Sequence, residues 1–254
     1  MQASLLRTEE LPTARILGIP MHCVSMTQAV ERVAAFVRAG EPRLLITLGV
    51  EMVMHARHDD AFRDVARQAD LLVPDSIGVV WAARRQGFNV ERVAGIDLLD
   101  RLAERGVREG WRFYFLGGQP EVARAAADRL IERHPGMCVA GCRDGYFRED
   151  AEVVAQVRQA APQVLLVGLG SPRQELWARR HAAELGVPVT IGVGGSFDVL
   201  AGRLQRAPVW MRRTGLEWLY RLVTQPARLI RMLVLPHFAW IILTTSPRAD
   251  RSRA

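Results

Sequence analysis

The seven residues LVPDSIG, numbers 72–78, contain the transition from a buried strand to a helix that decides the fold. The apolar run 71–73 predicts a strand, and Pro74 ends its hydrogen bonding because proline has no N–H to donate. Asp75 then falls at the carboxyl end of this strand, ahead of a helix expected over residues 77–86. Ligands bind at this edge of an open α/β sheet. Asp75 is therefore the candidate catalytic base.

Asp75 also has a simpler interpretation, as a cap of the helix that follows it. An Asp or Ser that precedes a helix accepts hydrogen bonds from the N–H groups of its first turn. Spacing alone favours the cap. The choice between cap and base therefore depends on the rest of the chain.

Short apolar strands and amphipathic helices alternate on both sides of this stretch. The expected strands are residues 15–19, 43–48, 70–73, 112–116, 137–141, 164–168 and 189–193. The expected helices are residues 27–38, 60–69, 77–86, 97–108, 121–133, 151–160 and 174–185. Ser25 and Gln28 form a capping box for the first of these helices. The pattern predicts a doubly wound, mostly parallel α/β sheet of the Rossmann-like kind, because eight clean repeats of a barrel are not present.

Composition divides the 254 residues into three expected parts. Residues 1–14 are expected to form a loose, flexible tail, residues 15–202 the α/β core, and residues 203–254 a helical appendage. The appendage holds ten arginines and two acidic residues, a balance of +8, whereas residues 1–202 have a balance of −1. Every basic residue is arginine, whose fork suits phosphate groups.

The appendage is expected to contain helices over residues 209–223 and 226–235, followed by an apolar piece. Its first helix mixes aromatic and basic side chains, as is typical of helices that lie on a membrane surface. These side chains are Trp210, Arg212, Arg213, Trp218, Tyr220 and Arg221. The alternative is a pair of dimerising helices, with the aromatic side chains in an ordinary interface. A nucleic-acid-binding tail is disfavoured by the apolar content of residues 229–243.

Several features of the sequence indicate a cytoplasmic protein. The three cysteines lack CxxC spacing and predict neither a zinc site nor a disulfide frame. The first residues lack the long apolar core of a signal peptide. No run reaches the ~18–20 apolar residues that cross a bilayer.

Three glycine-rich turns follow apolar strands and precede helices, at residues 117–118, 168–170 and 192–195. Glycine lets a phosphate approach the backbone, and a helix N-terminus supplies N–H donors. None of the turns is a complete GxGxxG or Walker A motif, so each is a weak signal alone.

The segment GSPRQE, residues 170–175, is more specific than the glycine turns. Pro172 sets the start of a helix, and Gln174 and Glu175 fall in its first turn at the ligand-binding edge. Gln174 is expected to hydrogen-bond a sugar or a uracil, or to make a capping contact.

Metal-ligand patterns are absent from the sequence. No histidines have HxxxH or HExxH spacing, and no DxD pair would hold Mg²⁺ on a nucleotide diphosphate. A bound phosphate would therefore need arginine as its counter-charge.

Taken together, these stretches resemble the WecG/TagA/CpsF family, glycosyltransferase family 26. The resemblance covers about residues 15–235, in the family's order. The matching segments are Thr47, 74–78, 92–98, 115–118, 144–147, 168–175, 192–198, 201–202, 206–208 and 215–221.

The resemblance implies a glycosyltransferase fold of the GT-E type and an inverting transfer without metal or cofactor. Members of the family typically move N-acetylmannosamine from UDP to a polyprenyl-diphosphate-linked sugar, in cell-surface polysaccharide biosynthesis. Relatives that transfer glucose or N-acetylmannosaminuronic acid are contenders. The expected place of action is the inner face of the cytoplasmic membrane, with peripheral attachment.

The resemblance also implies roles for individual residues. Asp75 matches the catalytic base, and Thr47 and Gln174 match the donor pocket. In this chain the residues that match the family's appendage arginines are Arg221, Arg228 and Arg231. They are expected to close over the site and bring positive charge to the leaving diphosphate. Further substrate contacts are expected from Gly118, Gly170, Gly194, Gly195 and Arg206.

Two residues depart from the family pattern. Gly49 stands where members often have Asn, and Ser76 stands where they often have Gly. Gly49 lacks a polar contact to sugar, so the identity of the donor sugar stays open. The alternative function is a non-catalytic scaffold that binds a nucleotide sugar. A homo-oligomer built through the apolar appendage is a further possibility.

Overall fold

The computed structural model describes residues 11–214, 216–224 and 233–245. Within these residues the chain forms a six-stranded parallel sheet in the order β4-β3-β8-β7-β5-β6. The strands are β3 (Arg43–Leu48), β4 (Leu71–Pro74), β5 (Arg112–Gly117), β6 (Cys138–Arg143), β7 (Val164–Gly168) and β8 (Val189–Gly192). Each coincides closely with an expected strand. The prediction of a doubly wound parallel α/β fold is confirmed.

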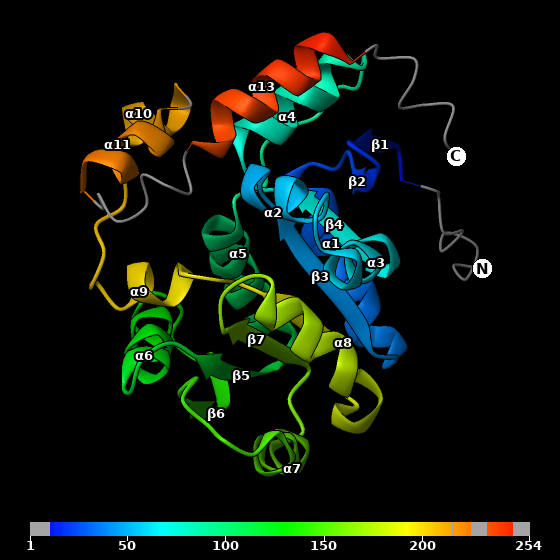
Figure 1. The fold of residues 1–254 in the computed structure, drawn as a ribbon. Coiled ribbons are helices and arrows are strands. Elements are labelled where there is room, and N and C mark those ends of the chain that lie inside the picture. Colours follow the sequence, from blue (N-terminus) through cyan, green and yellow to red (C-terminus); the bar gives the residue numbers. More distant parts are fainter. Residues whose placement is uncertain (1–10, 215, 225–232, 246–254) are drawn as a thin grey trace, which may run out of the picture.

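Helices cover both faces of the sheet (Figure 1). One face carries α1 (Met26–Ala39), α5 (Gly95–Glu109), α6 (Val122–Arg133) and α9 (Ser196–Leu200). The opposite face carries α2 (Val50–His55), α3 (Asp60–Gln68), α4 (Ile77–Arg85), α7 (Asp150–Ala160) and α8 (Arg173–Leu185). The predicted capping box of α1 is confirmed, because Ser25 and Gln28 exchange hydrogen bonds of 3.2 and 2.8 Å. The short helices α2 and α9 were not expected, since five or six residues are too few to show a helical period.

The N-terminal part of the fold differs from the single strand expected over residues 15–19. The chain forms an antiparallel hairpin of β1 (Thr13–Ile16) and β2 (Ile19–His22). Both turn residues have positive φ, 49° at Leu17 and 85° at Gly18, as a two-residue hairpin turn requires. Leucine is a rare residue in that conformation, so the usual turn signal is missing from the sequence.

Neighbouring strands β3 and β8 send their chains to opposite faces of the sheet. After β3 the chain enters α2, where Val53 is buried in the same cluster as Ile46. After β8 it enters α9, where Phe197 is buried with Leu45 on the other face. The loops separate at the carboxyl ends of these strands, which makes a topological switch point. Open α/β sheets bind their ligands in such a crevice.

The described part of the chain beyond β8 is helical, with α10 (Val209–Arg213), α11 (Glu217–Thr224) and α13 (Val234–Thr244) following α9. The expectation of one helix over residues 209–223 was wrong, because α10 ends at Arg213 and α11 begins at Glu217. The sequence between them contains a glycine, which is a poor helix former. The expected helix over residues 226–235 lies mostly outside the described residues. The expected apolar piece is helix α13.

Helix α13 lies along α4 (Figure 1), with Phe238 and Ile242 buried against the core. The Arg85 guanidinium of α4 also donates to the Leu243 carbonyl at 3.3 Å. This part of the appendage therefore packs directly against the helix that follows Asp75. None of the helices described has both the length and the apolar character needed to span a membrane.

We expect Gly117→Ala to destabilise the fold strongly. Gly117 ends β5 with a φ of 130°, and an added Cβ would lie 2.4 Å from the Gly168 backbone on the adjacent strand. Strain and overpacking together should lower the free energy of unfolding by about 3 kcal/mol or more. Gly170→Ala is the matched control, because its φ is 79° but the space around it is open. There we expect a loss of about 1 kcal/mol in urea unfolding; equal losses would contradict the steric argument.

Candidate functional site

The predicted site residues of the α/β core lie at the carboxyl edge of the sheet, where the switch point is. Thr47, near the end of β3, donates through Oγ1 to the Gly192 carbonyl of β8 at 3.3 Å. Its side chain also lies against Gly95, where an added Cβ would be 3.2 Å from Thr47 Cγ2. Gly95 in turn hydrogen-bonds Asp75. The structure thus joins Thr47 and Asp75 through Gly95.

The hydrogen bond that the structure describes for the Asp75 carboxylate goes to a helix other than the one that follows it. The N-cap of α4 is Ser76, which makes no capping bond to α4 and instead accepts from the Val50 N–H at 3.2 Å. Asp75 Oδ1 accepts from the N–H of Gly95, the first residue of α5, at 2.8 Å. The N-cap position of α4 thus belongs to Ser76, and the bond described for Asp75 is made to α5. The carboxylate is held across the edge of the sheet at the start of another helix.

The loop before α5 holds the segment around Asp75 by three successive contacts. Arg92 Nε donates to the Asp75 carbonyl at 2.6 Å, and Val93 N–H donates to the Pro74 carbonyl at 2.8 Å. The bond from Gly95 N–H to the carboxylate completes the set. Arg92 was not among the expected site residues. Its only signal was its place at the head of the matching segment 92–98.

Two arginines near Asp75 form ion pairs that connect the core to the appendage. Arg92 Nη2 lies 2.7 Å from Glu217 Oε2 at the start of α11. Both Nη atoms of Arg206 bind the Asp97 carboxylate of α5, at 2.7 and 2.6 Å. In this structure the Arg206 fork, an expected substrate contact, is thus engaged by Asp97.

Positive charge is favoured at this position. Burial opposes the charge of Arg206, but its hydrogen bonds to Asp97 and the nearby charges of Glu217 and Asp75 outweigh that effect and raise its pKa. In the parts of the chain that the structure describes, no three His, Cys, Asp or Glu side chains are grouped so that they could hold a metal ion. Arginine and carboxylate groups provide the charge here.

Gln174 and Glu175 form a buried polar pair beneath the glycine turn that follows β8. Gln174 Oε1 accepts from the Gly194 N–H at 3.0 Å, and Gln174 Nε2 donates to Glu175 Oε1 at 2.6 Å. Both side chains are almost fully buried. Gln174 thus contacts the turn between β8 and α9, while its own helix α8 has no side-chain cap bond at its N-cap, Pro172.

The glycine turns differ in what their N–H groups do. The N–H of Gly118 donates to the Gly168 carbonyl at 3.0 Å, and that of Gly194 is taken by Gln174. These two N–H groups therefore hold the turns together. A Cβ added at Gly170 or Gly194 would meet nothing within 4 Å, so both Cα atoms face open space where a ligand can approach. Gly195 is the N-cap of α9.

The three appendage arginines singled out by the resemblance cannot be placed in the site. Arg221 belongs to α11, but its side chain is outside the described part. Arg228 and Arg231 also lie outside the described residues. Among the described residues, the ion pairs of Arg92 with Glu217 and of Arg206 with Asp97 link the appendage to the site.

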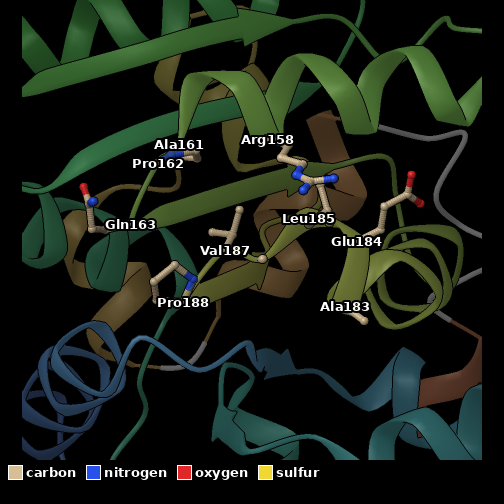
Figure 2. Close-up of a pocket in the computed structure, with 10 residues that line it drawn as sticks. Arg158, Ala161, Pro162, Gln163, Ala183, Glu184, Leu185, Val187 and Pro188 are labelled. Carbon is tan, nitrogen blue, oxygen red and sulfur yellow. The ribbon is translucent and has the colours of Figure 1, made fainter.

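Figure 2 shows a cavity of about 480 Å³ at the opposite edge of the sheet. It lies among the C-terminal ends of α7 and α8 and the residues that precede β7 and β8. Arg158 and Glu184 border it. The cavity therefore lies away from Asp75 and is not part of the site described above.

We expect Glu175→Gln to flatten the dependence of stability on pH. Burial raises the pKa of Glu175, and hydrogen bonds from Gln174 and Ser171 only partly offset it. A carboxyl whose pKa is raised by folding favours the folded state below its ordinary pKa and loses that contribution as pH rises. The melting temperature of the wild type, relative to Glu175→Gln, should therefore fall as the pH rises above the ordinary carboxyl pKa of 4.5. Glu91→Gln, at an exposed position, should keep the wild-type profile.

Comparison with known proteins gives a consistent result. The profile of the glycosyl transferase WecG/TagA/CpsF family matches residues 14–252. A Bacillus spizizenii (strain W23) protein is 34% identical over 200 residues, which is 78% of each chain. A Bacillus subtilis (strain 168) protein is 33% identical over 79% of this chain and 78% of its own. A Staphylococcus aureus (strain NCTC 8325) protein is 30% identical over 94% of this chain and 95% of its own. All three are named N-acetylglucosaminyldiphosphoundecaprenol N-acetyl-beta-D-mannosaminyltransferase.

Proposed function

Because the chain belongs to the glycosyl transferase WecG/TagA/CpsF family, we propose that it moves a sugar from UDP to a polyprenyl-diphosphate-linked saccharide. The names of the three relatives support an N-acetylmannosamine-type donor and a lipid-linked acceptor for cell-surface polysaccharide. Glucose and N-acetylmannosaminuronic acid are the other donor sugars to test. The observation that carries the proposal is the oriented carboxylate of Asp75 at the carboxyl end of β4, next to the switch point.

In this proposal Asp75 is the general base of an inverting transfer. The carboxylate takes the proton of the acceptor hydroxyl, whose oxygen attacks the anomeric carbon. The bond from that carbon to the UDP oxygen breaks, and UDP leaves with the electron pair from the opposite face. The Gly95 N–H holds Oδ1 so that the carboxylate does not have to reorient during the reaction.

The negative charge that develops on UDP needs a counter-charge. We propose that arginine supplies it without a metal ion or cofactor. Arg92 and Arg206, which pair with Glu217 and Asp97 in this structure, lie near Asp75 and support this assignment. Positive groups that are already in place stabilise such charge without reorganisation. The appendage arginines Arg221, Arg228 and Arg231 are proposed to add to it when substrate is bound.

We propose that the protein acts at the inner face of the cytoplasmic membrane, attached peripherally through its appendage. Trp210 of α10 and Trp240 of α13 are 61% and 63% exposed. Ile77 and Trp81, on one side of the neighbouring helix α4, are also exposed. Aromatic and aliphatic side chains with basic neighbours are the composition that binds the lipid interface. The same side chains would also suit an oligomer interface. Vesicle sedimentation together with light scattering distinguishes membrane binding from oligomer formation.

The test of this function is UDP release from a panel of UDP-sugars, with a short-chain polyprenyl-diphosphate-sugar acceptor and EDTA present. Release that requires the acceptor supports a metal-independent transferase and identifies the donor. If UDP binds but no donor in the panel releases it, the non-catalytic scaffold is the better account. Loss of activity in EDTA that added Mg²⁺ restores would contradict the proposed role of arginine.

A further inference from the structure

The appendage reaches the segment around Asp75 through one buried carboxylate. Glu217, the first residue of α11, is only 6% exposed, and its Oε2 binds Arg92 at 2.7 Å. The same guanidinium donates through Nε to the Asp75 carbonyl at 2.6 Å. Arg92 thus joins the appendage to the backbone of the proposed catalytic residue.

Arg92 also begins the loop that fixes the Asp75 carboxylate. Three residues further on, the Gly95 N–H binds Asp75 Oδ1, and between them Val93 N–H binds the Pro74 carbonyl. A shift of Arg92 would therefore displace the donor that orients the carboxylate. Since small displacements of reacting groups cost large factors in rate, the anchoring of Arg92 has a kinetic consequence.

A second ion pair holds the appendage in the same place. Arg206, at its start, binds Asp97 in the first turn of α5 through both Nη atoms. The charge of Arg206 also acts on both Glu217 and Asp75. The two pairs fix the appendage on either side of the segment 92–97, whose Gly95 is the donor to Asp75.

We propose that Glu217 is a positioning residue for Asp75, acting through Arg92. This inference rests on the proposed function of Asp75. It assigns to the appendage a role in building the catalytic geometry, in addition to the proposed contacts with lipid and diphosphate. The contact that carries this role is the ion pair of Glu217 with Arg92.

The first test compares Glu217→Ala and Glu217→Gln with the wild type in acceptor-dependent UDP release. The alanine variant leaves Arg92 without this anchor, and we expect kcat to fall about 10- to 100-fold. The amide of Glu217→Gln still accepts a hydrogen bond, so this variant should retain more activity. UDP affinity, measured by calorimetry, should stay within about twofold of the wild type, because a change in kcat alone marks loss of transition-state geometry. Glu91→Gln, which removes a charge from the exposed neighbour of Arg92, is the matched control and should be unchanged.

A double variant separates positioning from a general structural effect. If Glu217 acts through Asp75, adding Glu217→Ala to Asp75→Asn should not lower the residual rate further. Additive losses, a kcat within twofold of the wild type in Glu217→Ala, or a loss of UDP affinity alone would overturn the proposal. With a wild-type enzyme that is active, any of these results leaves the proposed function intact.

Hydrogen exchange gives a readout that does not depend on activity. The amides of Val93 and Gly95 donate the two bonds that hold the Asp75 segment. Their protection should fall about tenfold in Glu217→Ala and stay unchanged in Glu91→Gln. Unchanged protection in Glu217→Ala would overturn the positioning role. If the wild type transfers no sugar while protection falls as expected, the proposed function fails and the structural coupling stands.

Discussion

Asp75→Asn is expected to lower acceptor-dependent turnover by about 100- to 10,000-fold, because the amide cannot take the proton of the acceptor hydroxyl. The substitution is nearly isosteric, and the asparagine oxygen can still accept from the Gly95 N–H. The fold and UDP affinity should therefore be preserved. Turnover is measured by steady-state UDP release, UDP affinity by calorimetry, and the stability of the fold by the melting temperature.

The control for this prediction is Asp64→Asn, on the exposed side of α3. It removes the same charge away from the sheet edge and should leave turnover unchanged. An Asp75→Asn enzyme that turns over at the wild-type rate would remove Asp75 from the role of base. A variant that has lost UDP binding as well would instead assign Asp75 to the donor pocket.

Ending the chain at Gly202 is expected to abolish both turnover and membrane association. The truncation removes Arg206 and Glu217, which pair with Asp97 and Arg92, and also removes the exposed aromatic side chains of the appendage. Turnover should fall at least about 100-fold, since the geometry around Asp75 is no longer held. Sedimentation with anionic vesicles should fall to background. A truncated protein that is folded and fully active would refute the role of the appendage.

Phe238→Ala tests the same idea without shortening the chain. Phe238 is 2% exposed, and its replacement loosens the contact of α13 with α2 and α4. The substitution removes no arginine from the chain. We expect weaker vesicle binding together with a smaller loss of turnover than truncation causes. Light scattering of the same samples separates membrane binding from an oligomer. Loss of a dimer with unchanged vesicle binding would favour the dimerising alternative.

Local sequence signals predicted the sheet and its long helices. Apolar runs of four to six residues marked the parallel strands, and the Ser25–Gln28 capping box marked the start of α1. The same signals placed Asp75 and Thr47 at one edge, because the carboxyl ends of parallel strands share that edge. Hairpin β1–β2 was not predicted, because its turn residue Leu17 has a positive φ and leucine is not a signal for that conformation.

The contacts that build the site could not be predicted, because they join distant parts of the chain. Glu217 and Arg92 are 125 positions apart, and Arg206 and Asp97 are 109 apart. Neither the period of a helix nor the alternation of a strand predicts contacts between residues so far apart in the sequence. The partner of Asp75 was missed for a related reason. A carboxylate before a helix suggests a cap for that helix. In the folded protein, tertiary packing instead places the start of α5 within hydrogen-bond distance of Asp75.

The most direct test of the account is the product of the reaction. Wild-type protein would be incubated with UDP-N-acetylmannosamine and a polyprenyl-diphosphate-linked N-acetylglucosamine, and the lipid analysed by mass spectrometry and NMR. The account predicts an acceptor that is heavier by one N-acetylhexosamine residue, with the anomeric configuration inverted and with no product from Asp75→Asn. UDP binding without any extended lipid, for this donor and the other UDP-sugars, would contradict it. Retention of configuration would contradict the single displacement that Asp75 is proposed to assist.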